Sequence, residues 1–350
     1  MGGRGRARDG RPAQRGQARR QQGCGDDRPR RRFRLTDRAV GRLRLLLALA
    51  AVSLAGFLLY RALRRYDLSE IVASVMAIPP ARLALTGGFA AASYLCLTGF
   101  DALALRCVGR PLPYPRVALA SFVSLSIGHN VGLAALSSGT IRYRFYSRWG
   151  LGAGEIAKVI LYCAITVGLG LAALGGAALL LRPALAEEVT RLGRPTVMGL
   201  GAACLALVIA YPVLAALRRC APLRLGRWSL ELPEPRLALA QIGIGALNFA
   251  CVAACLHQAL LTARPDLPYL SVAAIYVIAN VAAIVTHVPG GLGVIEGVVL
   301  LLLPQPGVVG ALIAFRVAYY LVPLGLGGLL FLLAELAMRH GQAPPVQEPR

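Results

Sequence analysis

Eight windows of mostly apolar residues recur along the 350-residue chain, and they restrict it to a membrane fold. A helix that crosses the hydrocarbon of a bilayer needs roughly 20 such residues. The windows that reach or approach this length are 45–60, 83–105, 117–136, 155–181, 197–217, 237–261, 269–286 and 307–336. Apolar residues make up 57% of the chain and charged residues 15%, which leaves too little polar surface for a water-soluble protein of this size. The sequence therefore predicts an all-α polytopic membrane protein with about eight transmembrane helices.

Positive charge is concentrated ahead of the first window. Residues 1–44 contain fifteen Arg and four Asp, a net charge of +11 and half of the formal +22 of the whole chain. Because few core-forming residues accompany this charge, the segment is predicted to be a disordered, Arg-rich cytoplasmic arm. It either stays solvated or binds an anionic membrane surface, and nucleic acid is the disfavoured partner. Residues 45–338 form the predicted polytopic membrane domain, and 339–350 a short polar tail.

The sequence lacks the common motifs for ATP binding, serine hydrolysis and metal binding. It has no G-x-x-x-x-G-K-[ST] loop for ATP and no G-x-S-x-G nucleophile turn. The four His and eight Cys residues do not form a metal-binding pattern. We therefore predict no catalytic residue, no metal and no cofactor.

A Pro-Gly-Gly-x-Gly turn interrupts the apolar sequence VTHVPGGLGVIEGVVLLLL at residues 285–303. In hydrocarbon, non-helical backbone is tolerated only where protein or a water-filled cavity satisfies its polar groups. The apolar helix that follows the turn reaches only to Pro304 and is too short to span. The pattern predicts a re-entrant broken helix, whose first turn would attract a phosphate while Glu296 faces an ammonium group. The alternative is an ordinary hairpin loop with Glu296 as a first-turn cap in solvent.

A second interruption lies at LSIGHNVGLAALSSGTIRYRFYSRWG, residues 125–150. Here a small-residue turn, Ser138-Gly139, precedes Arg142 and Arg144, which stand among aromatic residues. Small residues allow close approach to the backbone, and guanidinium groups bind phosphate through a fork of donors. The mixture suits a lipid headgroup. The alternative is an interfacial loop in which arginines extend to the membrane surface beside a belt of aromatic residues.

The positive-inside rule adds a reason to expect broken elements. If the arm is cytoplasmic and all eight windows span, the outside loops would carry Arg142, Arg144 and the Arg residues of 218–236. A re-entrant segment would return its flanking charges to the side from which it came. Either the rule fails in this chain or some elements do not cross.

Ionisable residues inside a membrane default to functional candidates. Asp101 and Arg316 lie within apolar windows, and His287 lies beside the break. Each also has a structural interpretation, with Asp101 as an interfacial cap, Arg316 as an ion-pair partner and His287 as a satisfied interface residue. The predicted lipid-headgroup residues are Asp101, Arg142, Arg144, His287, Gly290, Gly291, Gly293, Glu296 and Arg316.

Three stretches together resemble a known family. They are FDALALRCVGRPLPYPRVALASF, GHNVGLAALSSGTIRYRFYSRWGLGAGEIAKV and ANVAAIVTHVPGGLGVIEGVVLLLL. Over roughly residues 40–338 the chain is similar to the membrane region of the multiple peptide resistance factor family of lysylphosphatidylglycerol flippase/synthase proteins. The resemblance implies a multi-pass protein of the bacterial inner membrane that passes aminoacylated phosphatidylglycerol to the outer leaflet and gives resistance to cationic peptides. It also favours Asp101, Arg142 and Glu296 as the functional charges.

The chain departs from this family in two ways. Ser138-Gly139 stands where members usually carry Gly-Gly, which makes the backbone there less permissive. The cytoplasmic domain that transfers the aminoacyl group in synthase members is absent before Arg350, so synthesis by this chain alone is not expected.

Three functions follow as hypotheses. The first is a flippase-like translocator of phospholipid, with aminoacylated phosphatidylglycerol as the candidate substrate. The second is a membrane subunit of an aminoacyl-phospholipid synthase that acts with a separate catalytic chain. The third is an envelope scaffold or glycolipid accessory protein. Each of these hypotheses is compatible with a homo-oligomer of this chain.

Overall fold

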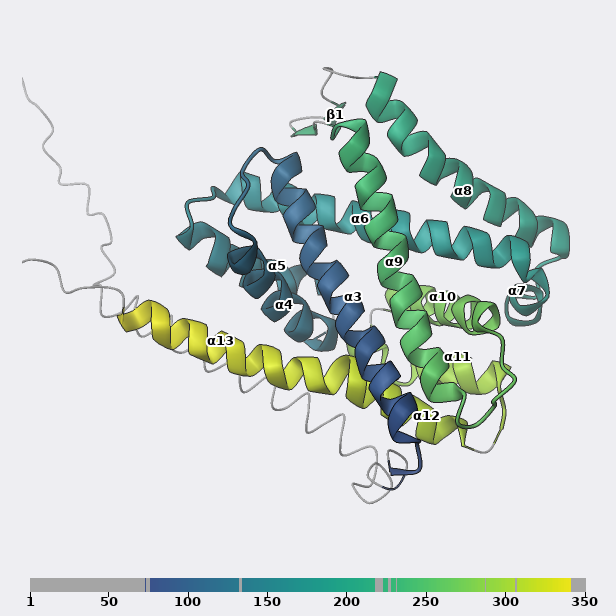
Figure 1. Ribbon diagram of the computed structural model, residues 1–350. Helices are drawn as coiled ribbons and strands as arrows, with labels where there is room; N and C mark the ends of the chain where they lie inside the picture. Colours follow the sequence, from purple (N-terminus) through teal and green to yellow (C-terminus); the bar gives the residue numbers. More distant parts are fainter. Residues whose placement is uncertain are drawn as a thin grey trace, which may run out of the picture. The chain divides into compact units, whose positions relative to one another are not determined.

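The regular structure in the described part of the chain is helical apart from one short pair of antiparallel strands. The computed structural model describes residues 73, 76–131, 134–217, 223–225, 228–230, 232–286, 288–305 and 307–340, all within one compact unit, Ala48–Arg350. The elements, shown in Figure 1, are α3 (Pro80–Cys107), α4 (Tyr114–Val131), α5 (Ala134–Arg148), α6 (Ala153–Leu181), α7 (Pro183–Thr190), α8 (Arg194–Leu217), β1 (Leu223–Leu225), β2 (Trp228–Leu230), α9 (Pro235–Leu260), α10 (Tyr269–Thr286), the 3-10 turn η1 (Pro289–Gly291), α11 (Val294–Leu302), α12 (Val308–Arg316), the π-helical turn η2 (Val317–Leu321) and α13 (Val322–His340). The predicted arm 1–44 and the window 45–60 lie outside the described residues.

Six of the described helices are long and apolar enough to cross a membrane. They are Pro80–Cys107, Ala153–Leu181, Arg194–Leu217, Pro235–Leu260, Tyr269–Thr286 and the continuous run Val308–Ala337. The prediction of an all-α polytopic membrane fold is confirmed, but the count of eight spans is not. The window 117–136 falls across α4 and α5, so it does not form one continuous span.

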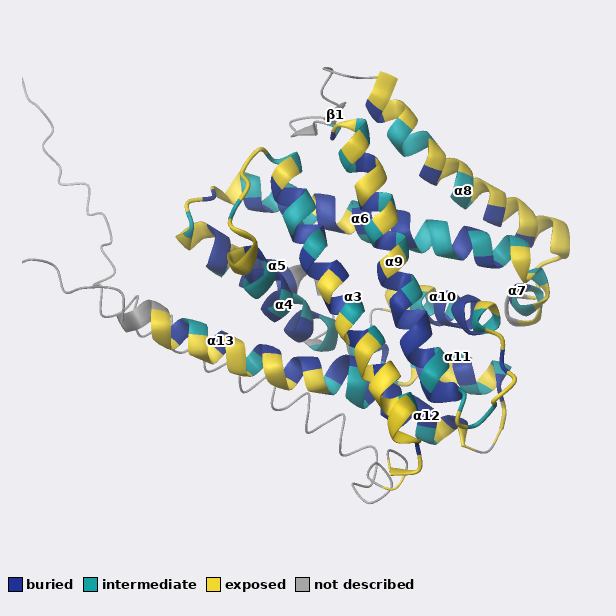
Figure 2. Cartoon of the chain, in the orientation of Figure 1, coloured by how far each residue is buried: buried dark blue, intermediate teal, exposed yellow. Residues whose placement is uncertain are grey.

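The surface of the helices is apolar, as expected for a protein solvated by lipid. Large apolar side chains such as Leu207 and Ile209 on α8 and Leu329 and Leu333 on α13 are exposed. Figure 2 shows α8 and α13 with long exposed faces, whereas the C-terminal half of α9 is mostly buried. Such extensive exposed apolar surface would cause a water-soluble protein to aggregate.

Helices α3 and α9 form the centre of the bundle and run antiparallel. Near one end of the pair, Arg82 Nη1 donates to Gln258 Oε1 at 2.7 Å, and in the middle Ser93 Oγ donates to Asn248 Oδ1 at 2.7 Å. Both helices begin with a proline at the first position, where the missing N–H is not needed. The end of α3 at Cys107 therefore lies beside the start of α9. We call this the first end of the bundle, and the end near Leu260 the second end.

Helix α6 runs beside α9 and touches it through two glycines. A Cβ placed on Gly170 would lie 2.3 Å from the carbonyl carbon of Gly245, and one on Gly245 would lie 2.6 Å from the carbonyl oxygen of Thr166. Small residues commonly permit such backbone contact between membrane helices.

Gly245→Val is therefore expected to separate α6 from α9 and destabilise the protein. Overpacking of this kind costs about 1–3 kcal/mol. The measurement is the fraction that stays monodisperse in detergent after a heating series. Gly243→Val, on the same helix, is the control, because a Cβ on Gly243 meets nothing within 4 Å. Equal loss in the two variants would refute the close contact.

The first hairpin consists of α4 and α5, and it starts and finishes at the first end. Arg110, just before α4, donates through Nη2 to the carbonyl of Gly150, just after α5, at 2.9 Å. The guanidinium of Arg116 also lies over the ring of Trp149, 6.0 Å from its centroid. The segment 114–148 thus enters the bundle and returns to the end from which it came.

The second hairpin consists of α10 and α11 and uses the opposite end. Helix α10 follows the loop that leaves α9, and Gly307, after α11, lies against that loop, since a Cβ on Gly307 would be 3.3 Å from Cβ of Ala263. The short apolar helix predicted after the Pro-Gly-Gly turn is present as α11, with nine residues. Nine residues rise only about 14 Å, less than half of a bilayer core.

The two hairpins meet inside the bundle. A Cβ on Gly290, in the turn of the second hairpin, would lie 3.6 Å from the carbonyl oxygen of His129 near the end of α4. Their charged flanks remain at the end from which each hairpin starts, as expected for re-entrant elements. In particular, Arg148, at the end of α5, returns to the same end of the bundle as Arg110.

Candidate functional site

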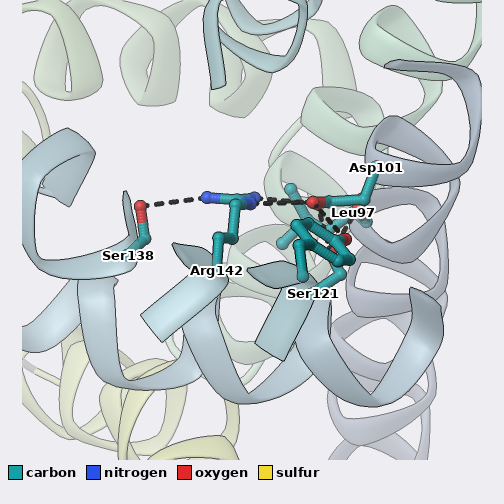
Figure 3. A network of polar contacts seen from close by, with 6 residues as sticks. Leu97, Asp101, Ser121, Ser138 and Arg142 are labelled. Atoms are coloured by element: carbon teal, nitrogen blue, oxygen red, sulfur yellow. Dashed lines mark hydrogen bonds and ion pairs between the residues drawn. The ribbon is translucent and has the colours of Figure 1, made fainter. Parts of the chain in front are cut away.

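The first candidate group is a buried ion pair between α3 and α5. Arg142 donates through Nε to Asp101 Oδ1 at 2.7 Å and through Nη2 to Asp101 Oδ2 at 2.8 Å, so the contact is bidentate. The Asp101 side chain is fully buried and that of Arg142 is 3% exposed. A carboxylate and a guanidinium paired in this fork geometry are among the stronger polar contacts in proteins. Figure 3 shows the guanidinium between Asp101 and Ser138.

Neighbouring hydroxyl groups complete the hydrogen bonds of this pair. Ser121 on α4 donates to Asp101 Oδ2 at 2.6 Å, and Tyr146 on α5 donates to Oδ1 at 2.8 Å. The third guanidinium nitrogen of Arg142, Nη1, donates to Ser138 Oγ at 3.0 Å. Ser138 and Gly139 lie within α5 and not in the predicted turn, and the serine that stands where family members usually carry glycine holds Arg142. The network fastens both helices of the first hairpin to α3.

The second candidate group lies at the turn of the second hairpin. Arg316 on α12 pairs with Glu296 on α11 through Nε and, at 2.9 Å, through Nη2. The same guanidinium donates to the carbonyl of Gly290 and, at 2.8 Å, to the carbonyl of Gly291. One buried arginine thus satisfies both a carboxylate and the free carbonyl groups of the break, which bare hydrocarbon could not do.

Glycine is required in this turn by its backbone conformation. Gly290, Gly291 and Gly293 have φ angles of 62°, 58° and 80°. These values lie in the left-handed region that other L-residues rarely adopt. The Gly293 N–H donates to Glu296 Oε2 at 2.8 Å, so Glu296 caps α11 while it pairs with Arg316. Glu296 is therefore both the cap of α11 and a buried charge, and as a cap it does not face solvent.

A π-helical turn, η2, follows Arg316 directly. A π turn leaves backbone carbonyl groups without the usual intrahelical donor. Tyr94 OH donates to the carbonyl of Tyr319 at 3.3 Å, and Asn130 Nδ2 donates to the carbonyl of Tyr320 at 3.4 Å. The Tyr320 ring lies 4.5 Å from the Arg316 guanidinium, within cation–π range. The turn therefore joins α3 and the first hairpin to α12, and no feature of the sequence had indicated it.

Arg144 belongs to a third group, away from the two pairs. Its Nη2 lies 2.7 Å from Oε1 of Glu335 on α13, and Arg148 Nη1 lies 3.4 Å from the other oxygen of the same carboxylate. Sequence reasoning overlooked Glu335, although a carboxylate inside the apolar window 307–336 is the signal that had selected Asp101. This contact joins the first hairpin to α13.

The predicted headgroup residues therefore fall into separate groups. Asp101 pairs with Arg142, while Glu296 pairs with Arg316 beside Gly290, Gly291 and Gly293. His287 lies outside the described residues. In the part of the chain that the structure describes, no cluster of three His, Cys, Asp or Glu side chains could hold a metal ion. The role of these residues toward a lipid stays a prediction.

Comparison with known proteins gives one family and two relatives. Residues 45–327 match the model of the family described as lysylphosphatidylglycerol synthase TM region. The uncharacterised protein slr0712 of Synechocystis sp. is 35% identical over 267 residues, which cover 75% of this chain and 82% of slr0712. The inner membrane protein YbhN of Escherichia coli is 28% identical over 254 residues, which cover 71% of this chain and 78% of YbhN.

Proposed function

The chain belongs to the family of the lysylphosphatidylglycerol synthase TM region, and on this premise we propose that it moves phospholipid between the leaflets of the membrane that it spans. The observation that carries the proposal is the Glu296–Arg316 pair at the turn of a broken hairpin inside an apolar bundle. Transporters commonly bind substrates at such discontinuous helices, where exposed backbone and helix ends meet charged groups.

The chemistry of this pair fits a phospholipid headgroup. A phosphate can replace Glu296 as the partner of Arg316, because guanidinium groups bind phosphate and carboxylate in the same forked geometry. An ammonium group can in turn replace Arg316 as the partner of Glu296. A headgroup that carries both charges would leave neither side chain unpaired. Aminoacylated phosphatidylglycerol has this combination, and we propose it as the substrate that uses both groups.

The proposed orientation in the membrane rests on the arginines at the two ends of the bundle. Among the described residues, the first end carries more arginines in and beside its loops, namely Arg106, Arg110, Arg116, Arg148, Arg224, Arg236 and Arg339. At the second end these are Arg82, Arg182, Arg191, Arg194 and Arg264. By the positive-inside rule, we propose that the first end faces the cytoplasm. With YbhN named an inner membrane protein, we propose the bacterial inner membrane as the location.

Native mass spectrometry of the purified protein tests whether it holds phospholipid. We expect bound phospholipid on the wild-type chain and its loss in the double variant Glu296→Gln/Arg316→Gln, which removes both headgroup partners. The matched control is Arg110→Gln/Glu155→Gln, which neutralises a more exposed ion pair of 3.4 Å at the first end. A wild-type protein without phospholipid, or equal retention by the two double variants, would overturn the proposal.

A further inference from the structure

Three of the described helices, α3, α4 and α6, have counterparts that begin at a constant interval later in the chain. Helices α3 and α9 begin at Pro80 and Pro235, α4 and α10 at Tyr114 and Tyr269, and α6 and α12 at Ala153 and Val308. In each pair the two starts are 155 residues apart. Both halves thus have the order of long helix, hairpin, long helix.

Residue identities follow the same interval. The pattern Leu-Pro-Tyr-x-x-Val-Ala occurs at 112–118 and again at 267–273, where each half enters its hairpin. Arg-Leu-Ala-Leu occurs at 82–85 and, one residue short of this interval, at 236–239, near the start of the first long helix of each half. Matching sequence and matching helix order together indicate two copies of one unit, residues 80–181 and 235–337.

The two copies are inverted relative to each other. Their first helices, α3 and α9, run antiparallel, with Ser93 and Asn248 in contact at mid-length. One hairpin returns to the first end, where Arg110 contacts Gly150, and the other to the second end, where Gly307 lies against Ala263. The hairpin turn of the second copy touches α4 of the first at His129. Transporters with inverted repeats of this kind bind substrate where the repeats meet.

Each hairpin is fastened by an ion pair within its own copy. In the first copy Arg142 of the hairpin pairs with Asp101 of the long helix before it. In the second copy Glu296 of the hairpin pairs with Arg316 of the long helix after it. We call these pairs the first latch and the second latch. Because each is buried, a hairpin can move away only if both charges of its latch find new partners.

Building on the proposed function, we propose that the headgroup pathway is the junction of these inverted repeats, and that a phosphate-bearing headgroup opens the two hairpins alternately. The headgroup phosphate would take the arginine of a latch, and an ammonium group would take its carboxylate. Opening of the first latch exposes the junction to the first end, and opening of the second exposes it to the second end. Since the two hairpins touch at the junction, one stays closed while the other opens.

Cysteine labelling from each side of the membrane tests this arrangement. The reporters are Ser124→Cys on α4 and Ala279→Cys on α10, which occupy equivalent positions in the two copies and are both fully buried. They are placed singly in a folded variant that lacks the native cysteines. A membrane-impermeant thiol reagent is added to one face of sealed vesicles, and the labelling rate is measured.

Neutralising a latch should open only its own end. With Asp101→Asn/Arg142→Gln, we expect Ser124→Cys to label about tenfold faster from the first-end face, the change that a shift of about 1.4 kcal/mol in an opening equilibrium produces. With Glu296→Gln/Arg316→Gln, Ala279→Cys should gain similarly from the opposite face. If a double variant does not fold, Ser121→Ala/Tyr146→Phe weakens the first latch and Glu296→Gln alone weakens the second.

Labelling of both reporters from one face, or a gain in both reporters when either latch is neutralised, would overturn the inference. The assay does not require transport, so the two proposals can fail separately. Side-specific labelling in a protein that moves no lipid would support alternate opening of the hairpins and refute lipid translocation. Lipid movement without side-specific labelling would support translocation and refute alternate opening.

Discussion

Asp101→Asn and Arg142→Gln are each expected to destabilise the protein by about 3–5 kcal/mol, because each leaves an uncompensated charge or donor in the buried interior. The pair is bidentate, two hydroxyl groups donate to Asp101, and a third accepts from Arg142. The double variant removes both charges together, so it should recover a substantial part of the loss. Thermal denaturation in detergent, followed by size-exclusion chromatography, gives the four stabilities of this double-mutant cycle.

Arg110→Gln serves as the control for this cycle. It breaks the ion pair between Arg110 and Glu155, whose side chains are 49% and 35% exposed, and the exposed hydrogen bond to the Gly150 carbonyl. Exposed ion pairs of this kind contribute about 0–1 kcal/mol. If either single neutralisation at the first latch were no worse than Arg110→Gln, Asp101 and Arg142 would not be a buried pair. If the two losses simply added in the double variant, the residues would not interact.

Glu296→Gln is expected to slow a cationic aminoacyl headgroup at least about tenfold more than unmodified phosphatidylglycerol, since a hydrogen bond to a charged group is worth about 1.5–3 kcal/mol. The glutamine keeps an oxygen that can accept the Gly293 N–H, so the cap on α11 is retained. The substitution removes the negative charge of the carboxylate. In the proposal, an ammonium group pairs with this charge in place of Arg316. The measurement compares the translocation of both labelled lipids in liposomes.

Glu155→Gln is the matched control for this substitution. Glu155 caps α6 through the Gly152 N–H at 2.7 Å, as Glu296 caps α11 through Gly293, but it lies outside the buried site. It should slow neither lipid. Equal slowing of both lipids by Glu296→Gln would mean that the carboxylate supports only the hairpin turn. No effect on either lipid would remove Glu296 from the pathway.

The membrane class and the break in the second hairpin could be predicted because both depend on local sequence. Apolar length defines most of the spanning helices, and Gly290, Gly291 and Gly293 mark a turn with left-handed backbone. The window 117–136 misled for the same reason. Its hydropathy resembles that of a span, but its residues belong to two helices, α4 and α5, that form a hairpin.

The pairing of charges could not be predicted, because it depends on contacts between distant segments. Asp101 and Arg142 are 41 residues apart, and nothing local indicates that they meet across α3 and α5. The sequence had also left Arg316 between a functional and a structural role, and the structure gives it the carbonyl groups of the break as partners. The internal repeat was visible in Leu-Pro-Tyr-x-x-Val-Ala at 112–118 and 267–273, but apolar helices differ so little in composition that seven positions are easily missed.

Translocation itself is the central claim, and reconstitution measures it most directly. The wild-type protein is placed in liposomes with a trace of headgroup-labelled aminoacyl phosphatidylglycerol, and a membrane-impermeant reductant bleaches the label in the outer leaflet. We predict that wild-type protein makes the inner-leaflet label accessible, that Arg110→Gln/Glu155→Gln does the same, and that Glu296→Gln/Arg316→Gln does not. Protection of the inner-leaflet label in wild-type liposomes, equal to that in liposomes without protein, would contradict the account.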